Sequence, residues 1–348
     1  MGRRVMVQCN GDRIILLGNK GKRKSYFEKA VSESGLEYKF YSHEELDILR
    51  KNEDLSSVIL KTDPPVTDSV RIDDLKNFTS RYMKMLGTVS QLPVLEHFNS
   101  PDSVAALLDK KKCKQRLINE NIPVTHMYDR EFSCTDELLD FMAENRIPQI
   151  FVKPLTGSGA AGVTAVRFSP SGNRLIAYSC AAVDNGTPVN TKKLTRYENK
   201  EAKKLLDVLL LLPCITEKWH AKSRCNGYSY DLRVVMQDGN ADYILPRLSK
   251  GPVTNLHLNN HAEYYENLGL EEALTEEITD ICRRAACCFP GLRSAGIDVL
   301  IERGRPYIIE MNGQGDLIYQ DIYNENIIYR SQVEIMKKIF KEKEKRYE

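Results

Sequence analysis

The sequence lacks an excess of charge of either sign, and it lacks long hydrophobic segments. Its 348 residues include 50 Lys and Arg against 48 Asp and Glu, which gives a formal net charge of +2. A balance this close argues against a nucleic-acid-binding protein, because such proteins concentrate positive charge. The longest apolar run, from Val208 to Leu212 and onward to Ile215, contains Pro213 and is too short to span a bilayer. We therefore expect neither nucleic acid nor a membrane among the partners.

Paired cysteines and targeting signals are also missing. The cysteines number nine, an odd count, and their spacing fits no paired metal motif. The N-terminus carries Arg3 and Arg4 but no apolar segment of signal length. This pattern is typical of free thiols in a reducing compartment, so we expect a cytoplasmic protein. The positions are Cys9, Cys113, Cys134, Cys180, Cys214, Cys225, Cys282, Cys287 and Cys288.

The common nucleotide fingerprints are absent from residues 1–99. Strand patterns at 13–18, 38–41 and 58–61 surround a helical pattern at 26–34. Alternating strands and helices predict an α/β unit with a largely parallel sheet. No Gly-x-Gly-x-x-Gly motif follows the first strand, so this unit is not expected to bind a nucleotide.

A β-hairpin is predicted near the C-terminus, where apolar residues alternate on both sides of Arg303-Gly304-Arg305. If these three residues form the loop, Glu302 pairs with Pro306. Asp298 then lies directly opposite Glu310, with the two side chains about 5 Å apart on one face.

Asn312 lies two residues beyond Glu310 and therefore points to the same face. Two facing carboxylates repel each other unless a positive group lies between them. Together with an amide oxygen they form a set of hard oxygen ligands, which suits Mg²⁺ or Mn²⁺. The alternative is a solvated hairpin face with scattered charges.

A phosphate-binding loop is predicted after the strand that ends at Lys153. The loop contains Gly157, Ser158, Gly159 and Gly162, and such small residues let backbone N–H groups approach a polyanion. Lys153 can add a point charge on a phosphate. This is not a Walker A loop, since Gly-Lys-Ser/Thr is absent and no helix follows. An ordinary flexible hairpin loop is the alternative.

Two further elements carry charge that could bind anions. Ser100 and Pro101 are typical of a helix start, and the pattern predicts one lysine-rich helix from there to near Asn121.

Asp231 and Arg233 share one face of a later strand. The guanidinium suits phosphoryl or carboxylate oxygens, although a cross-strand ion pair would also account for it.

In this order, the pieces resemble the ATP-grasp superfamily, and in particular the RimK-type and glutathione synthetase-like carboxylate–amine ligases. The resemblance covers residues from about 100 to 330. It implies an ATP-grasp fold of α/β class, in which residues 1–99 form a preceding α/β domain, 100–215 the first lobe and 216–348 the second lobe. It also implies ATP and Mg²⁺ as cofactors. Proteins of this fold often pair through their lobes, so a homodimer is a candidate assembly, but the sequence does not fix the oligomeric state.

The resemblance assigns roles to residues of this sequence. ATP is expected at Lys110, Lys153, Gly157, Ser158, Gly159, Gly162, Glu217, Lys218, Trp219 and Asp231. Phosphoryl transfer and the substrate side are expected to involve Arg233, Arg247 and Asn255. The metal is expected at Asp298, Glu310 and Asn312.

The sequence departs from the RimK-like pattern on the side expected to face substrate. Gly251-Pro252-Val253-Thr254, Asn259-Asn260 and the Gly-Gln-Gly-Asp segment at 313–316 replace the usual residues. Glutamate is therefore not inferred as substrate. The expected reaction is ATP-dependent amide formation from a small or peptide carboxylate and an amine, through an acyl phosphate. The alternatives are a peptide-modifying ligase of a natural-product pathway, a small-molecule kinase with the same metal set, and a nucleotide-binding module without catalysis.

Overall fold

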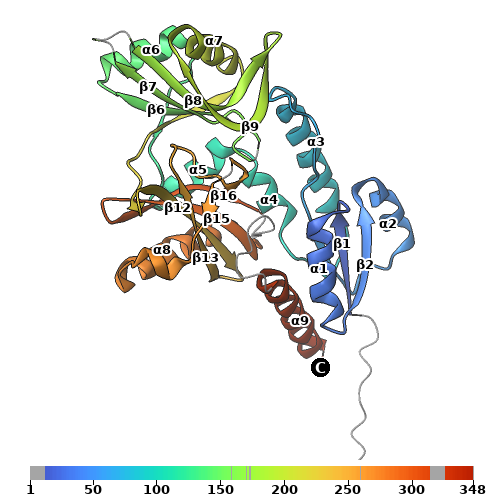
Figure 1. Cartoon of the computed structure of the whole chain (residues 1–348). Helices are drawn as coiled ribbons and strands as arrows, with labels where there is room; N and C mark the ends of the chain where they lie inside the picture. Colours follow the sequence, from blue (N-terminus) through green and yellow to red (C-terminus); the bar gives the residue numbers. More distant parts are fainter. Residues whose placement is uncertain are drawn as a thin grey trace, which may run out of the picture.

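The computed structural model describes residues 12–157, 159–169, 171, 174–258, 260–313 and 326–347 (Figure 1). Three sheets follow one another along the described chain, and helices cover them. None of the helices in these ranges is long and apolar enough to cross a membrane. The order of strands and helices matches the α/β class that the sequence predicts.

The first sheet is parallel and has the strand order β2-β1-β3-β4. Alternate residues of its central strand face opposite layers: Ile14 and Leu16 pack with α1, whereas Ile15 and Leu17 pack with α2. The elements are β1 (Arg13–Gly18), α1 (Lys22–Ser32), β2 (Glu37–Ser42), α2 (Leu46–Asn52), β3 (Val58–Thr62), α3 (Asp74–Val89) and β4 (Glu96–His97).

The second sheet is antiparallel, with the order β5-β10-β6-β7-β8-β9. Helices α6 and α7 pack against it through Leu138, Met142 and Leu206. The elements are β5 (Met127–Tyr128), α6 (Thr135–Glu144), β6 (Gln149–Pro154), β7 (Thr164–Ser169), β8 (Arg174–Asp184), β9 (Thr187–Glu198), α7 (Asn199–Leu209) and β10 (Cys214–Lys218).

The third sheet has the order β14-β13-β12-β15-β16, and β11 also pairs with β12. Its apolar core includes Ile278 and Ile281 of α8 as well as Val104 of α4 and Leu117 of α5. The elements are α4 (Pro101–Leu107), α5 (Lys110–Asn119), β11 (Arg224–Cys225), β12 (Tyr228–Gln237), β13 (Asn240–Ser249), β14 (His261–Ala262), α8 (Glu272–Cys287), β15 (Ser294–Glu302) and β16 (Arg305–Asn312).

The predicted facing of Asp298 and Glu310 is confirmed, but the predicted loop is wrong. Glu302 pairs with Arg305, so the loop contains only Arg303 and Gly304, both at positive φ (52° and 74°). A two-residue loop of this kind matches the twist of the strands. The shorter loop by itself would shift the register, but a bulge between Asp298 and Val299 restores the pairing of Asp298 with Glu310.

The single helix predicted from Ser100 to near Asn121 is interrupted. Ser100 does cap α4, because its hydroxyl accepts a hydrogen bond from the Ser103 N–H at 3.3 Å. The helix ends at Leu107, and a second one begins where the Asp109 carboxylate accepts from the Lys112 N–H at 3.0 Å. This second cap makes Lys110 the first residue of α5.

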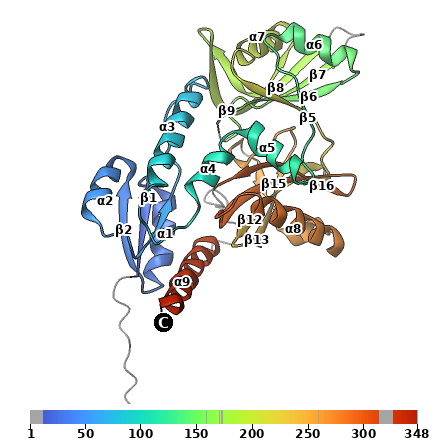
Figure 2. The same cartoon turned by 180° about the vertical axis from the view of Figure 1, so that it is seen from behind.

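The C-terminal helix α9 (Ile327–Tyr347) contacts both the third and the first sheet. At its start Ile328 packs with Val235 and Leu245 of the third sheet, and the rest of the helix lies against the first. Tyr329, Val333, Met336 and Phe340 join the apolar cluster of β1 and α1. Figure 2 shows α9 beside that unit, at the opposite end of the molecule from the second sheet. The boundaries at 99 and 215 stay predictions; β10 runs across the second of them and pairs with β6.

Candidate active site

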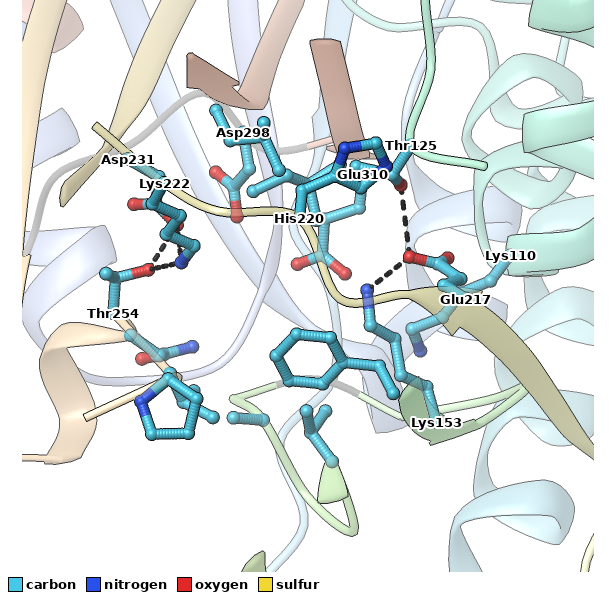
Figure 3. Close-up of a pocket in the computed structure, with 18 of the residues that line it drawn as sticks. Lys110, Thr125, Lys153, Glu217, His220, Lys222, Asp231, Thr254, Asp298 and Glu310 are labelled. Carbon is cyan, nitrogen blue, oxygen red and sulfur yellow. Dashed lines mark hydrogen bonds and ion pairs between the residues drawn. The ribbon is translucent and has the colours of Figure 1, made fainter. Parts of the chain in front are cut away.

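A cleft lies between the second and third sheets, and side chains from both of them line it (Figure 3). The third sheet contributes Asp231, Arg247, Asp298 and Glu310. The second sheet contributes Lys153, Glu217 and Lys218, and Lys110 enters from the start of α5. Thus the cleft brings together residues that are up to 200 positions apart in the sequence.

Glu217 is the centre of a buried ionic network. Its carboxylate oxygens lie 2.5 Å from Lys114 Nζ and 2.7 Å from Lys153 Nζ, and the Thr125 hydroxyl donates to it at 3.0 Å. Burial would raise the pKa of Glu217, but the two lysines outweigh it and lower the pKa to about 2. Burial also lowers the pKa of Lys114. The charged carboxylate fixes Lys153 at the cleft.

Lys110 connects α5 with the glycine-rich loop. Its Nζ donates to the Gly157 carbonyl at 2.9 Å, and burial lowers the pKa of this lysine. The loop has positive φ at Gly157, Gly159 and Gly162. A Cβ on Gly162 would lie 2.7 Å from Pro154, so glycine is needed there for space as well as conformation. Ser158, predicted to belong to the site, lies outside the described residues.

Two arginines neutralise the acidic residues of the third sheet. Arg247 Nε lies 2.7 Å from Asp231, and its Nη2 lies 3.0 Å from Asp298. Arg233, directly beside Asp298 in the strand pairing, contacts the same carboxylate at 2.6 Å. Burial disfavours the charged Arg247, but Asp231 and Asp298 outweigh it and raise its pKa. Asp231 and Arg233 each form an ion pair with the residue opposite on a neighbouring strand, which is the cross-strand alternative that the sequence left open.

The three predicted metal ligands differ in how they are engaged. Asp298 is held by both arginines, and the Asn312 amide nitrogen lies 3.5 Å from the Gly296 carbonyl. The half-buried Glu310 carboxylate has no hydrogen-bond or ion-pair partner within the described residues. Figure 3 shows this carboxylate pointing into the pocket. Two carboxylates and an amide oxygen on paired strands fit the chemistry of a hard cation.

No group of three or more His, Cys, Asp or Glu side chains within the described ranges is arranged to hold a metal ion. This result does not conflict with the predicted set, because that set contains two carboxylates and one amide. It does exclude a histidine- or cysteine-rich centre from the described part of the chain.

Most of the predicted residues line the cleft, whereas Gly162, Trp219, Arg233 and Asn312 do not; Arg233 and Asn312 line a second cavity instead. Lys218 and Asn255 line the cleft, together with Gly157 and Gly159. Trp219 is absent from the lining. The centroid of its ring lies 5.4 Å from the ring centroid of Phe151 and 4.6 Å from Cζ of Arg167. The Trp219 ring therefore packs on β6, β7 and β8 of the second sheet.

Sequence reasoning did not identify Lys222, Thr254 and His220. Lys222 Nζ lies 3.2 Å from Asp231 and 2.7 Å from the Thr254 hydroxyl, which itself donates to Asp231. His220 joins the sheets: Nε2 accepts from the His126 N–H at 3.3 Å, and Nδ1 lies 2.9 Å from Glu302. No local signal marks these residues.

Lys114, also unidentified, did have a signal. It follows Lys110 by four residues, which places both on one face of a helix. A reading of that periodicity would have selected it from the lysine-rich segment.

Comparisons with known proteins place the chain by its fold. No protein-family model and no curated protein sequence matches it. Among solved structures, the ATP-grasp ligase PsnB with minimal precursor, Mg and ADP is 14% identical, with a TM-score of 0.58, over 95% of this chain and 98% of PsnB. D-alanine–D-alanine ligase from Bacillus anthracis complexed with ATP is also 14% identical, with a TM-score of 0.59, over 97% and 100% of the two chains.

A third structure, the macrocyclase MdnC bound with precursor peptide MdnA from Microcystis aeruginosa MRC, is 12% identical with a TM-score of 0.57. The match covers 93% of this chain and 98% of MdnC. At sequence identities of 12–14%, structural similarity identifies the fold and not the substrate. The chain has the ATP-grasp fold, as its motifs predict.

Proposed function

We propose that this chain is an ATP-dependent carboxylate–amine ligase that forms an amide through an acyl phosphate and releases ADP and phosphate. One observation carries the proposal. Lys110, Lys153, Arg247 and Glu310 converge on one cleft of an ATP-grasp fold, and within the described residues the Glu310 carboxylate has no hydrogen-bond or ion-pair partner. This arrangement offers cations to a polyphosphate and a carboxylate to its metal ion.

The nucleotide would lie between the second and third sheets. Lys110 and Lys153 would offset phosphate charge, and backbone N–H groups of the loop at Gly157–Gly162 would approach the same oxygens. Glu217 and Lys218 line this part of the cleft at the end of β10. Because Glu217 already holds two lysines, we assign it mainly to positioning Lys153.

Asp298, Glu310 and Asn312 would hold Mg²⁺, or Mn²⁺ in its place. When bound, the metal supplies charge neutralisation on the phosphates. Within the described residues no group hydrogen-bonds or ion-pairs with Glu310, and two arginines orient Asp298.

Arg233 and Arg247 would act on the substrate side. A carboxylate attacks the terminal phosphorus, and an amine then displaces phosphate through a tetrahedral intermediate whose oxyanion needs a donor. The two guanidiniums are the donors that the third sheet places nearest to Asp298. Asn255 would contact substrate from the loop after β13, and closure of the glycine-rich loop would keep water away from the acyl phosphate.

The acid is a small molecule or the carboxylate of a peptide. Both kinds are consistent with the similar structures, whose names include a D-alanine ligase and a macrocyclase with its precursor peptide. The activation chemistry is common to both, so one assay tests it.

That assay is hydroxylamine trapping with Mg²⁺, ATP and pools of amino acids, small acids and peptides. We expect a hydroxamate together with ADP and phosphate, and the productive pool identifies the acid. A hydroxamate with AMP would instead mean adenylation and would overturn the phosphoryl mechanism. ADP with a stable phosphorylated product would establish a kinase.

A further inference from the structure

A second, wider cavity of about 700 Å³ adjoins the proposed nucleotide site. Lys110, Lys153, Arg247, Asn255 and Glu310 line both spaces, so the wide cavity opens directly on the proposed reacting centre. Its outer wall consists of the segment between β3 and α3 together with the first half of α3. In Figure 1 this helix extends from the first sheet toward β9. A cavity of this size suits a small molecule or a peptide end.

The outer wall of this cavity carries exposed apolar side chains among polar ones such as Thr67, Asp68 and Arg71. Val66 and Val70 are 64% and 53% exposed, which is unusual for two large apolar side chains so close together. Phe78 is partly exposed, and all three residues line the cavity. None of the three packs in an apolar cluster of the described residues. We call Val66, Val70 and Phe78 the apolar wall.

The rest of α3 shows that this exposure is local. Leu86 and Val89, on later turns of the helix, are buried in apolar clusters. Tyr82, between the two halves, is also buried. Leu75 and Tyr82 also line the cavity but pack in apolar clusters, so among the described residues Phe78 is the apolar cavity-lining residue of α3 that belongs to no cluster.

Polar and apolar side chains both line the cavity. Arg233 and Arg247 belong to this lining, and the proposed function places a carboxylate beside them. The apolar wall borders the same space from the first unit. An acid with an apolar side chain complements both parts of the lining, because its carboxylate meets the arginines and its side chain removes the wall from water.

We propose that the acid activated by this chain carries an apolar side chain or tail, and that Phe78 selects it with Val66 and Val70. The inference rests on the proposed function, since it takes the arginine end as the place of the carboxylate. Burial of a leucine-sized side chain gives a preference of about tenfold or more over alanine.

The test separates binding from chemistry. Ligand-observed saturation-transfer NMR on the full chain with ADP and Mg²⁺ measures the affinity of leucine, alanine and glutamate, each free and N-acetylated. Phe78→Lys removes the apolar surface at the wall. The matched control is Leu211→Lys, since Leu211 is 76% exposed and lies outside the cavity lining.

We expect the leucine compounds of at least one series to bind about tenfold more tightly than alanine or glutamate. Phe78→Lys should abolish this preference, while Leu211→Lys keeps it and both variants keep their ADP affinity. Equal binding of all side chains, a preference for glutamate, binding by none of the acids, or an unchanged preference in Phe78→Lys would each overturn the inference. A bound acid that gives no hydroxamate with ATP would refute the proposed ligase and leave the binding preference standing.

Discussion

Replacing Glu217 with glutamine removes the negative charge that Lys114 and Lys153 share in the buried network. The lowering of the Glu217 pKa from 4.5 to about 2 corresponds to roughly 3 kcal/mol in favour of the ionised form. Leaving buried charges without their partner costs about 3–5 kcal/mol. We therefore expect Glu217→Gln to lower the free energy of unfolding by about 3–5 kcal/mol.

Urea unfolding followed by fluorescence of Trp219, the single tryptophan, reports on this region because the indole packs on Phe151 of β6. The urea midpoint should fall by about 1–3 M. Glu131→Gln is the control, since the Glu131 side chain is 78% exposed and its loss should leave the midpoint unchanged. A loss below about 1 kcal/mol in Glu217→Gln would refute the view that the ion network stabilises the fold.

A second variant and a pH series test the same reasoning. Lys114→Met added to Glu217→Gln removes one uncompensated charge, so the double variant should be more stable than Glu217→Gln alone.

The folded-state pKa of Glu217 is depressed, so its contribution to the free energy of unfolding is complete above pH 4.5 and is lost as pH falls toward about 2. The difference between wild type and Glu217→Gln should therefore shrink across that range.

Three further predictions address the metal, the hairpin and the sheet junction. Glu310→Gln should reduce Mg²⁺-dependent turnover by at least about a hundredfold with an unchanged urea midpoint; full activity would refute the metal assignment. Gly304→Ala should destabilise the fold by about 1 kcal/mol because φ is 74° there, whereas Gly87→Ala within α3 should slightly stabilise it; thermal unfolding compares the two. Burial lowers the pKa of His220, so its stabilising contribution is present above pH 6.5 and lost as pH falls below it. The urea midpoints of wild type and His220→Gln should converge on acidification through that range, and parallel curves would contradict the role of the neutral ring.

The hairpin shows how far local chemistry reaches. The alternation around Gly304 predicted two paired strands and the facing of Asp298 with Glu310, and the structure confirms both. The loop length was wrong, because a one-residue change in the turn can be offset by a bulge elsewhere in the strand. Bulges depend on packing against neighbouring strands, here β12 beside β15, and no local pattern reports that.

The helix after Ser100 shows a similar limit. Its start was predictable because Ser and Pro have strong positional preferences there. Its interruption at Leu108 depended on Asp109, whose carboxylate caps a second helix. Asp is common within lysine-rich helices, so the residue alone does not reveal that its side chain turns back to the backbone.

The sequence by itself determined the kind of fold, the glycine-rich loop after Lys153 and the facing of Asp298 with Glu310. These depend on residue type and on spacing within one element, which a linear pattern preserves. Only the tertiary structure decided the partners: Glu217 with Lys114 across 103 residues, Arg233 with Asp298 across 65, and an apolar wall left open beside the cleft. Ion pairs and exposed apolar surface arise where separate elements meet. Their free energy depends on distance and burial, and these are properties of the folded chain alone.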